Sequence, residues 1–173
     1  MSVKTIGKDG RYTVSGPKVD TIGLPVPLQG LPPIIQVKGY TLLARTHFHV
    51  SLVCIGQIAM KHNLTDPGLV EKIIADFETY TEHARIDFLG FRNEFRFVQE
   101  ADMRSVIVMC DVSNLKEFFT LINTKYGVHL EYPPTHVTLY TLQLNVGIYV
   151  TDTADLATKT EAIPAPIDFG LLK

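Results

Sequence analysis

Two short stretches decide the fold: His49-Val50-Ser51-Leu52 and, later in the chain, His136-Val137-Thr138-Leu139. Each reads histidine, apolar, hydroxyl, apolar, and successive side chains of a β-strand point to opposite faces. The histidine and the hydroxyl therefore share one face, while the apolar residues face the core. A strand advances about 3.3 Å per residue, so each imidazole lies about 7 Å from its hydroxyl along the strand. Two such strands side by side would present two imidazoles and two hydroxyls to one cleft, a set that suits a phosphate group.

The composition is that of an ordinary globular domain. The chain has 173 residues, of which 20% are charged and 46% hydrophobic, and its net charge is −2. No broad basic field exists, so we do not expect long duplex DNA as a partner. Residues 1–20 lack the apolar segment of a signal peptide, and no apolar run is long enough for a membrane span, which favours a cytoplasmic protein without membrane contact. Cys54 and Cys110 fall in apolar, strand-like runs and are expected to be buried, reduced thiols.

Two segments carry helical periodicity. Asp66 is a suitable N-cap and Pro67 a suitable first helical residue, and the apolar spacing that follows predicts an amphipathic helix over 67–84. A second helix begins after Ser113 or Asn114, with an apolar face consisting of Leu115, Phe118, Phe119 and Ile122. Gly127 is expected to end that helix.

The remaining segments are predicted as strands or irregular chain. Strands are expected over 34–37, 40–44, 48–58, 86–97, 105–112, 135–142 and 146–150. Glycine and proline are frequent in 1–33, which is expected to be irregular apart from one short strand near 11–15. Residues 151–173 are weakly patterned and are expected to hold no regular element, since Pro164 and Pro166 interrupt them.

Each half of the chain therefore holds one helix and one histidine strand, which indicates an internal duplication. We expect an α+β fold: a single bilobal, pseudo-symmetric domain over 1–173, with two antiparallel sheets lining a central cleft and helices outside. Its divisions would be an irregular N-terminal extension (1–33), a two-lobed core (34–150) and a C-terminal segment (151–173).

The doubled motif resembles the signature of the two-histidine (2H) phosphoesterase superfamily. That superfamily includes the bacterial 2′-5′ RNA ligase-like proteins, the plant cyclic nucleotide phosphodiesterases and the RNA-trimming phosphodiesterases. Its members carry two H-x-[ST]-hydrophobic motifs on the central strands of two pseudo-symmetric lobes, and the resemblance covers about residues 34–150. It implies 2′,3′-cyclic phosphate or 2′-5′-linked nucleotide substrates.

The chemistry follows from the side chains of the two motifs. Neutral imidazole takes a proton and imidazolium gives one, and both forms are accessible near neutral pH because histidine titrates at about 6.5. His49 and His136 would transfer protons, while Ser51 and Thr138 would donate hydrogen bonds to the phosphate oxygens. We therefore expect a monomeric, metal-independent phosphodiesterase that needs no cofactor, acts on a nucleotide or short RNA, remains active in a chelator and has a bell-shaped pH–rate profile.

Two other functions remain open. His47 shares the strand face of His49, and with His136 these side chains would form a three-histidine metal site of an enzyme. A domain of the same fold could also bind nucleotides or RNA ends without turning them over.

Further residues are candidates for substrate contact. Tyr140 lies two residues beyond Thr138 and would share the face of the motif, where it is either a contact or a half-buried sheet residue. Tyr40 and Arg45 precede the first motif, and Arg45 would either neutralise phosphate charge or lie in solvent at a strand end. Residues 92–97 alternate arginine with phenylalanine, which fits either contact with single-stranded nucleic acid or an amphipathic strand.

Overall fold

The computed structural model describes residues 3–16, 18 and 20–172, and antiparallel strands are its main regular element. The strands are β1 (Lys4–Ile6), β2 (Tyr12–Ser15), β3 (Thr21–Pro25), β4 (Ile34–Val37), β5 (Tyr40–Ala44), β6 (His49–Cys54), β7 (Phe88–Glu100), β8 (Met103–Val112), β9 (His136–Thr141) and β10 (Thr160–Ile163). The helices are α1 (Ile55–Lys61), α2 (Leu69–Thr81), α3 (Leu115–Tyr126) and α4 (Thr153–Lys159), with a 3-10 turn η1 (Phe169–Leu172).

The sheet is continuous across both histidine strands. Its order is β1-β2-β3-β6-β9-β8-β7-β10, and the β4–β5 hairpin joins it where β5 pairs with β9. The predicted mixture of helices with an antiparallel sheet is confirmed. The predicted division into two sheets is wrong, because β6 pairs directly with β9 and links both halves into one hydrogen-bonded sheet.

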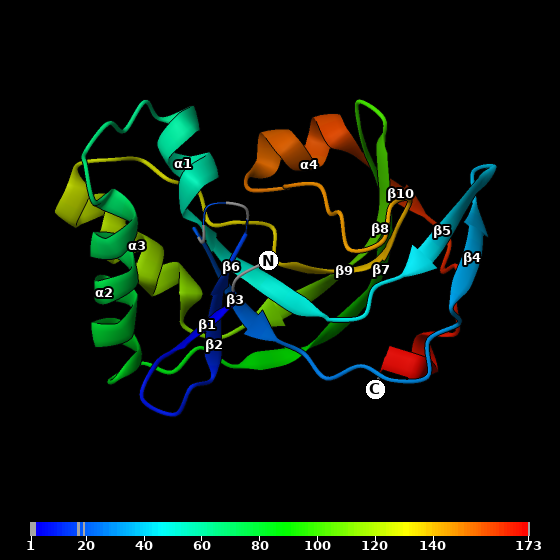
Figure 1. Ribbon diagram of the computed structural model, residues 1–173, viewed down its shortest axis with the longest axis horizontal. Helices are drawn as coiled ribbons and strands as arrows, with labels where there is room; N and C mark the ends of the chain where they lie inside the picture. Colours follow the sequence, from blue (N-terminus) through cyan, green and yellow to red (C-terminus); the bar gives the residue numbers. More distant parts are fainter. Residues whose placement is uncertain (1–2, 17, 19, 173) are drawn as a thin grey trace.

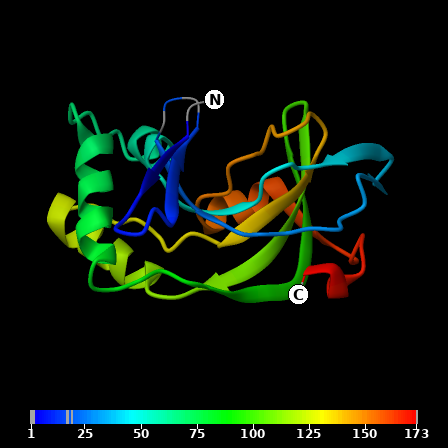
Figure 2. The ribbon, with the colours of Figure 1, turned by 60° about the horizontal axis from the view of Figure 1, so that its bottom comes forward.

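The helices gather at two places on this sheet. Figure 1 shows α1, α2 and α3 together at one end of the molecule, α4 alone over the region of β7 and β8, and the β4–β5 hairpin at the opposite end. Figure 2 shows the same separation after rotation. The three-helix end is held by fully buried aromatic rings: Phe77 of α2 lies edge-on to Tyr12 of β2, at 5.0 Å, and to Phe118 of α3, at 5.2 Å between centroids.

Both predicted helices are present; the start of α2 differs from expectation, whereas α3 begins after Asn114 as predicted. Helix α2 begins at Leu69. Gly68, which precedes it, has a left-handed φ of 82° and so separates Pro67 from the helix. Asp66 therefore is not its cap. In α3, Asn114 is the capping residue without a side-chain cap hydrogen bond, the four apolar residues expected on its inner face are buried, and Gly127 ends it in the left-handed conformation.

The segments expected to be irregular hold regular structure. The described part of residues 1–33 contains three strands: β2 confirms the short strand expected near 11–15, while β1 and β3 were not expected, and β3 lies inside the sheet beside β6. The glycines there separate short strands rather than prevent them, since Gly7, Gly10 and Gly16 lie in turns with positive φ. In the C-terminal segment, the carboxylate of Asp152 caps α4 by accepting from the backbone N–H of Asp155.

Two predicted strands are also corrected. The strand expected over 48–58 ends at Cys54, where α1 begins and buries Ile55 and Ile58. Residues 146–150 form an extended segment that pairs with no strand, and they pass over the sheet instead. Within the described ranges, no helix combines the length and hydropathy needed to cross a lipid bilayer.

Candidate functional site

The register between β6 and β9 brings the two motifs together. Val50 lies opposite Val137, and both side chains are fully buried in the core. Because the strands are antiparallel, each histidine then lies across from the hydroxyl residue of the other motif. All four of these side chains share the face of the sheet that the two valines do not occupy. Diagonal neighbours in such a pair are about 7–8 Å apart. His49 and His136 are such diagonal neighbours, at a separation that one phosphate group can bridge.

These side chains line one cavity of about 340 Å³, within the range of small-molecule sites. The motif residues on its floor are His49, Ser51, His136 and Thr138. The segment 145–150 forms its opposite wall, and Arg45 borders it from the chain just before β6. In Figure 1 this segment follows β9 and passes between α4 and the strands β6 and β9.

Each histidine strand has a β-bulge at the leucine of its motif. The pairing of β3 with β6 passes over Leu52, and the pairing of β8 with β9 passes over Leu139. A bulge interrupts the alternation of side chains and re-aims those that follow it. Beyond the first bulge, Cys54 comes back to the cavity. Beyond the second, Tyr140 pairs with Val106 and enters the core.

His136 is held in one orientation. Its ring Nδ1 lies 2.7 Å from the carbonyl oxygen of Pro134, which only accepts, so Nδ1 carries the proton and donates it. Nε2 is then the ring atom left for a ligand. The residue is 8% exposed, and burial lowers its pKa, while the hydrogen bond to Pro134 acts in the opposite direction by favouring the imidazolium.

His49 is half-buried and rests on a glycine of the neighbouring strand. A Cβ on Gly23 would lie 3.3 Å from the Cδ2 atom of the imidazole, so the missing side chain leaves room for the ring. Burial, the charge of Arg45 and the charge of His136 lower the pKa of His49 to about 4. The ring is therefore neutral over most of the pH range.

Arg45 brings a positive charge to the cavity. Its backbone N–H donates to the carbonyl of the bulged Leu139, which fixes the chain at this point, and its Nη1 would lie 3.0 Å from a Cβ on Gly147. Burial lowers the pKa of this guanidinium. Among the described residues no carboxylate forms an ion pair with Arg45, whose side-chain hydrogen bond goes to the carbonyl of His47. An anion is the natural complement of such a group.

The wall of the cavity is anchored at both of its ends. The side chain of Asn145 exchanges hydrogen bonds with Thr46, and Ile148 and Val150 pack in an apolar cluster with Ile107 of β8. No local pattern in the sequence marks this segment as the wall of a site, because its residues have the pattern of an ordinary strand. The same holds for the far end of the cavity, formed by Ser15, Gly16, Thr21, Cys54 and Tyr149.

Three residues considered from the sequence lie away from the cavity lining. Tyr140 is fully buried because of the bulge at Leu139, and its hydroxyl has no hydrogen-bond partner in the described structure. Tyr40, on the β4–β5 hairpin, stacks on Phe97 of β7 with 6.0 Å between the ring centroids. His47 is exposed.

The three-histidine metal site is not assembled. Within residues 3–16, 18 and 20–172, no three histidine, cysteine or carboxylate side chains lie close enough to hold a metal ion. Cys54 and Cys110 are buried free thiols, as predicted, and burial raises the pKa of each to about 12.

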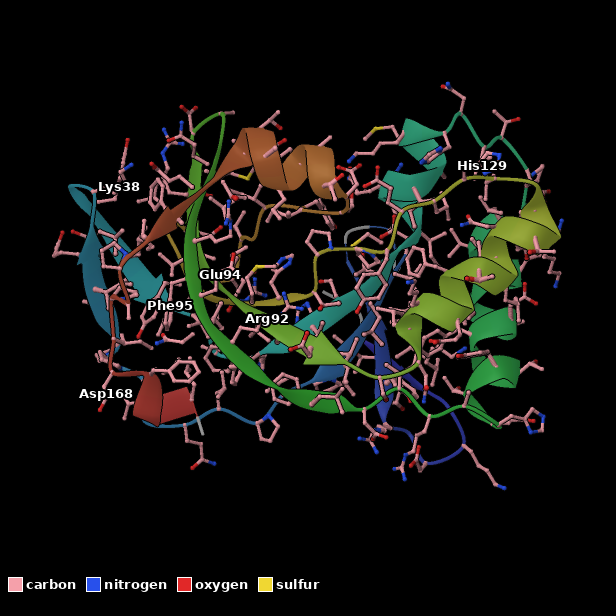
Figure 3. The ribbon with its side chains drawn as sticks, turned by 180° about the vertical axis from the view of Figure 1, so that it is seen from behind. Lys38, Arg92, Glu94, Phe95, His129 and Asp168 are labelled. Carbon is pink, nitrogen blue, oxygen red and sulfur yellow. The ribbon has the colours of Figure 1, made fainter. Side chains whose placement is uncertain are left out.

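The arginine–phenylalanine stretch is an amphipathic strand. Figure 3 shows Arg92, Glu94 and Phe95 on β7, seen from behind. Arg92 pairs with Asp111 and Arg96 with Glu94, while the phenylalanine rings are buried. A separate hollow of about 380 Å³ between β1–β2 and α2 is lined by apolar side chains together with two lysines and two carboxylates. It contains no histidine.

Comparisons of the chain with protein-family models, curated proteins and solved structures gave no match. Its function is therefore inferred from the residues of the cavity.

Proposed function

We propose that this chain is a metal-independent phosphodiesterase with a 2H phosphoesterase-like fold. It would hydrolyse nucleotide or oligonucleotide phosphodiesters of the 2′,3′-cyclic or 2′-5′-linked type. The observation that carries the proposal is the register of β6 and β9, which sets two imidazoles and two hydroxyls on one face, in one cavity, beside the guanidinium of Arg45.

The local symmetry of the two strands supports a duplicated site. The pair Val50–Val137 is its centre, with a histidine and a hydroxyl at equal distances on each strand. The bulges occur at equivalent positions, Leu52 and Leu139, and both leucines are fully buried. Each histidine strand thus departs from regular pairing at the same place, directly after its histidine and its hydroxyl residue.

The phosphate would lie between the imidazoles. The hydroxyls of Ser51 and Thr138 would donate to its non-bridging oxygens, where charge accumulates as the nucleophile attacks. Arg45 borders the same cavity beside Gly147 and would neutralise this charge. Fixed donors of this kind are effective because they need no rearrangement during the reaction.

The surroundings of the two histidines favour different roles. Burial and the cation of Arg45 keep His49 neutral, and it is assigned as the general base. Burial also lowers the pKa of His136, but this ring donates to a carbonyl through Nδ1, which opposes that shift by favouring the charged form, and it is assigned as the general acid. The bound phosphodiester anion raises the pKa of both rings, and the carbonyl of Pro134 directs the proton to His136.

The reaction is then a balanced displacement at phosphorus. Water attacks the phosphorus atom and gives a proton to His49 as the new P–O bond forms. The bond to the leaving oxygen breaks, and that oxygen takes the proton from Nε2 of His136. One proton enters and one leaves the histidine pair, and solvent restores the starting state.

The test is hydrolysis of nucleoside 2′,3′-cyclic monophosphates and of 2′-5′ and 3′-5′ dinucleotides in the presence of EDTA. We expect turnover by the wild type and a loss of about 10²–10⁴-fold in kcat for His49→Ala and for His136→Ala. His129→Ala, which changes a histidine outside the cavity lining, is the control.

The outcomes separate the alternatives. Activity that disappears in EDTA, or that survives both substitutions, would contradict the mechanism. Tight binding of these nucleotides without turnover, unchanged by either substitution, would favour a binding module instead.

A further inference from the structure

We propose that the end of the cavity next to β3 binds an uncharged, hydrogen-bonding nucleoside group attached to the phosphate. This region is called the hydroxyl end, and its residues are Ser15, Gly16, Thr21, Cys54 and Tyr149. The inference rests on the proposed function only for placing the phosphate between the two histidines.

A row of polar side chains crosses three strands at the hydroxyl end. Ser15 of β2 lies opposite Thr21 of β3, which in turn lies opposite Cys54 of β6. Directly opposed residues share a face, so all three project into the cavity. The bulge at Leu52 is the reason that Cys54 belongs to this row. Tyr149 comes from the opposite wall and lines the same end of the cavity.

The hydroxyl end is suited to a neutral group. None of its described lining residues is charged. The buried carboxylate of Asp20 lies behind it, with Oδ1 2.9 Å from where a Cβ on Gly16 would be. Its negative charge adds to burial in raising the pKa of Cys54 and Tyr149. The nearby ammonium of Lys61 is bonded to Asp152 and Asp155. A second phosphate would therefore be repelled here, whereas ribose hydroxyls and base N–H groups find partners.

The cavity extends to one side of the histidine pair only. Over β8, which is the corresponding place on the other side, apolar side chains fill the space: Ile107 and Met109 of the sheet and Ile148 and Val150 of the wall. Met109 lies opposite His136 and Ile107 opposite Thr138, so this cluster begins directly beside the motif. A ligand in the cavity can thus carry one nucleoside toward β3 and none toward β8.

The inference is tested by titrating the protein with adenosine 3′-monophosphate and with inorganic phosphate. Thr21→Val and Tyr149→Phe each remove one hydroxyl and keep the shape of the side chain. We expect each to weaken nucleotide binding roughly fivefold to tenfold, the effect of one hydrogen bond, and to leave phosphate binding unchanged. Thr124→Val and Tyr80→Phe are matched controls, since these residues lie on α3 and α2 outside the cavity.

Equal losses for nucleotide and phosphate, or a nucleotide that binds no more tightly than phosphate, would overturn the assignment. Thermal unfolding of each variant separates a local effect from a folding defect. Because the readout is binding, the result is independent of catalysis. A wild type that binds with this profile but never hydrolyses a phosphodiester would keep the hydroxyl end and remove the proposed activity.

Charge gives a second, independent readout. Adenosine 3′,5′-bisphosphate should bind more weakly than the 3′-monophosphate, because its extra phosphate meets the field of Asp20. Asp20→Asn, which keeps the shape of the side chain, should reduce this difference. Tighter binding of the bisphosphate to the wild type would contradict the requirement for a neutral group.

Discussion

The strands β6 and β9 carry nearly the same four residues, yet they place their histidines in different surroundings. His49 is half-buried above Gly23 and lies near a guanidinium. His136 is 8% exposed and donates through Nδ1 to the carbonyl of Pro134. Burial lowers the pKa of both rings; the cation lowers that of His49 further, whereas the carbonyl acceptor opposes the shift of His136. The comparison shows that a repeated motif can place its two histidines in different electrostatic surroundings when its neighbours are not repeated.

The largest effect is expected when the leaving group is changed, because this tests the difference in role between the two histidines. We expect His136→Ala to lose about 10²–10⁴-fold in kcat on nucleoside 2′,3′-cyclic phosphates, whose alkoxide needs a proton. On a p-nitrophenyl phosphodiester, whose leaving group needs none, this loss should almost disappear. His49→Ala should lose activity on both substrates. The measurement is, for each variant, the ratio of kcat on the cyclic phosphate to kcat on the p-nitrophenyl substrate. If His49→Ala rather than His136→Ala recovers activity on the p-nitrophenyl substrate, the two roles are exchanged.

Removal of the cation should have the next largest effect. Arg45→Met is expected to lower kcat/KM by roughly 10–100-fold, because a charge-assisted hydrogen bond to the phosphate is lost. It should also raise the pKa of His49, since the nearby positive charge is gone, and so move the acidic limb of the pH profile to higher pH. Arg92→Met is the matched control on the far part of β7, where Arg92 pairs with Asp111. An unchanged acidic limb would show that Arg45 does not act on His49.

A smaller effect is expected from crowding His49. Gly23→Ala adds a Cβ 3.3 Å from the imidazole and 3.3 Å from the Oγ1 atom of Thr13, and should reduce kcat about tenfold by displacing the base. KM should change less, since the groups that bind the phosphate are untouched. Gly170→Ala, in η1 and likewise without a positive φ, serves as the control. Equal effects from both variants would point to a general loss of stability.

The pH profile of the wild type compares the two histidines without any substitution. The base must be neutral, which requires a pH above about 4, and the acid must be protonated, which requires a pH below its lowered pKa. The maximum of kcat/KM is therefore expected below about pH 6.5, the ordinary value for histidine. A plateau that extends above pH 8 would mean that His136 is not the acid.

Much of the fold could be predicted from local patterns. The apolar spacing of α2 and α3 and the termination at Gly127 follow from helix periodicity and the conformational freedom of glycine. The start of α2 could not be predicted, because Asp66-Pro67 is a good start signal that the left-handed Gly68 overrides. Of the strands in residues 1–33, β2 was predicted, whereas β1 and β3 were not, for another reason. Short strands between glycines are defined by the partner with which they pair, and β3 has its partner in β6.

The candidate site was predictable in part. Alternation along a strand places a histidine and a hydroxyl on one face, and the structure brings both motifs into one cavity. The same rule misplaces Tyr140, because the bulge at Leu139 interrupts alternation after the motif. Whether Arg45 contacts the cavity could not be decided either. Its position depends on a hydrogen bond to Leu139, which is distant in sequence.

The sequence by itself determined which groups are available: two histidines, each two residues before a hydroxyl, on strands whose apolar residues must be buried. That follows from the period of a β-strand, a local property of the backbone. The tertiary structure decided how these groups differ. Strand register, the two bulges, the wall 145–150 and the neighbours of each imidazole depend on contacts between distant segments. Such contacts set burial and charge, and burial and charge set the proton affinity of each ring.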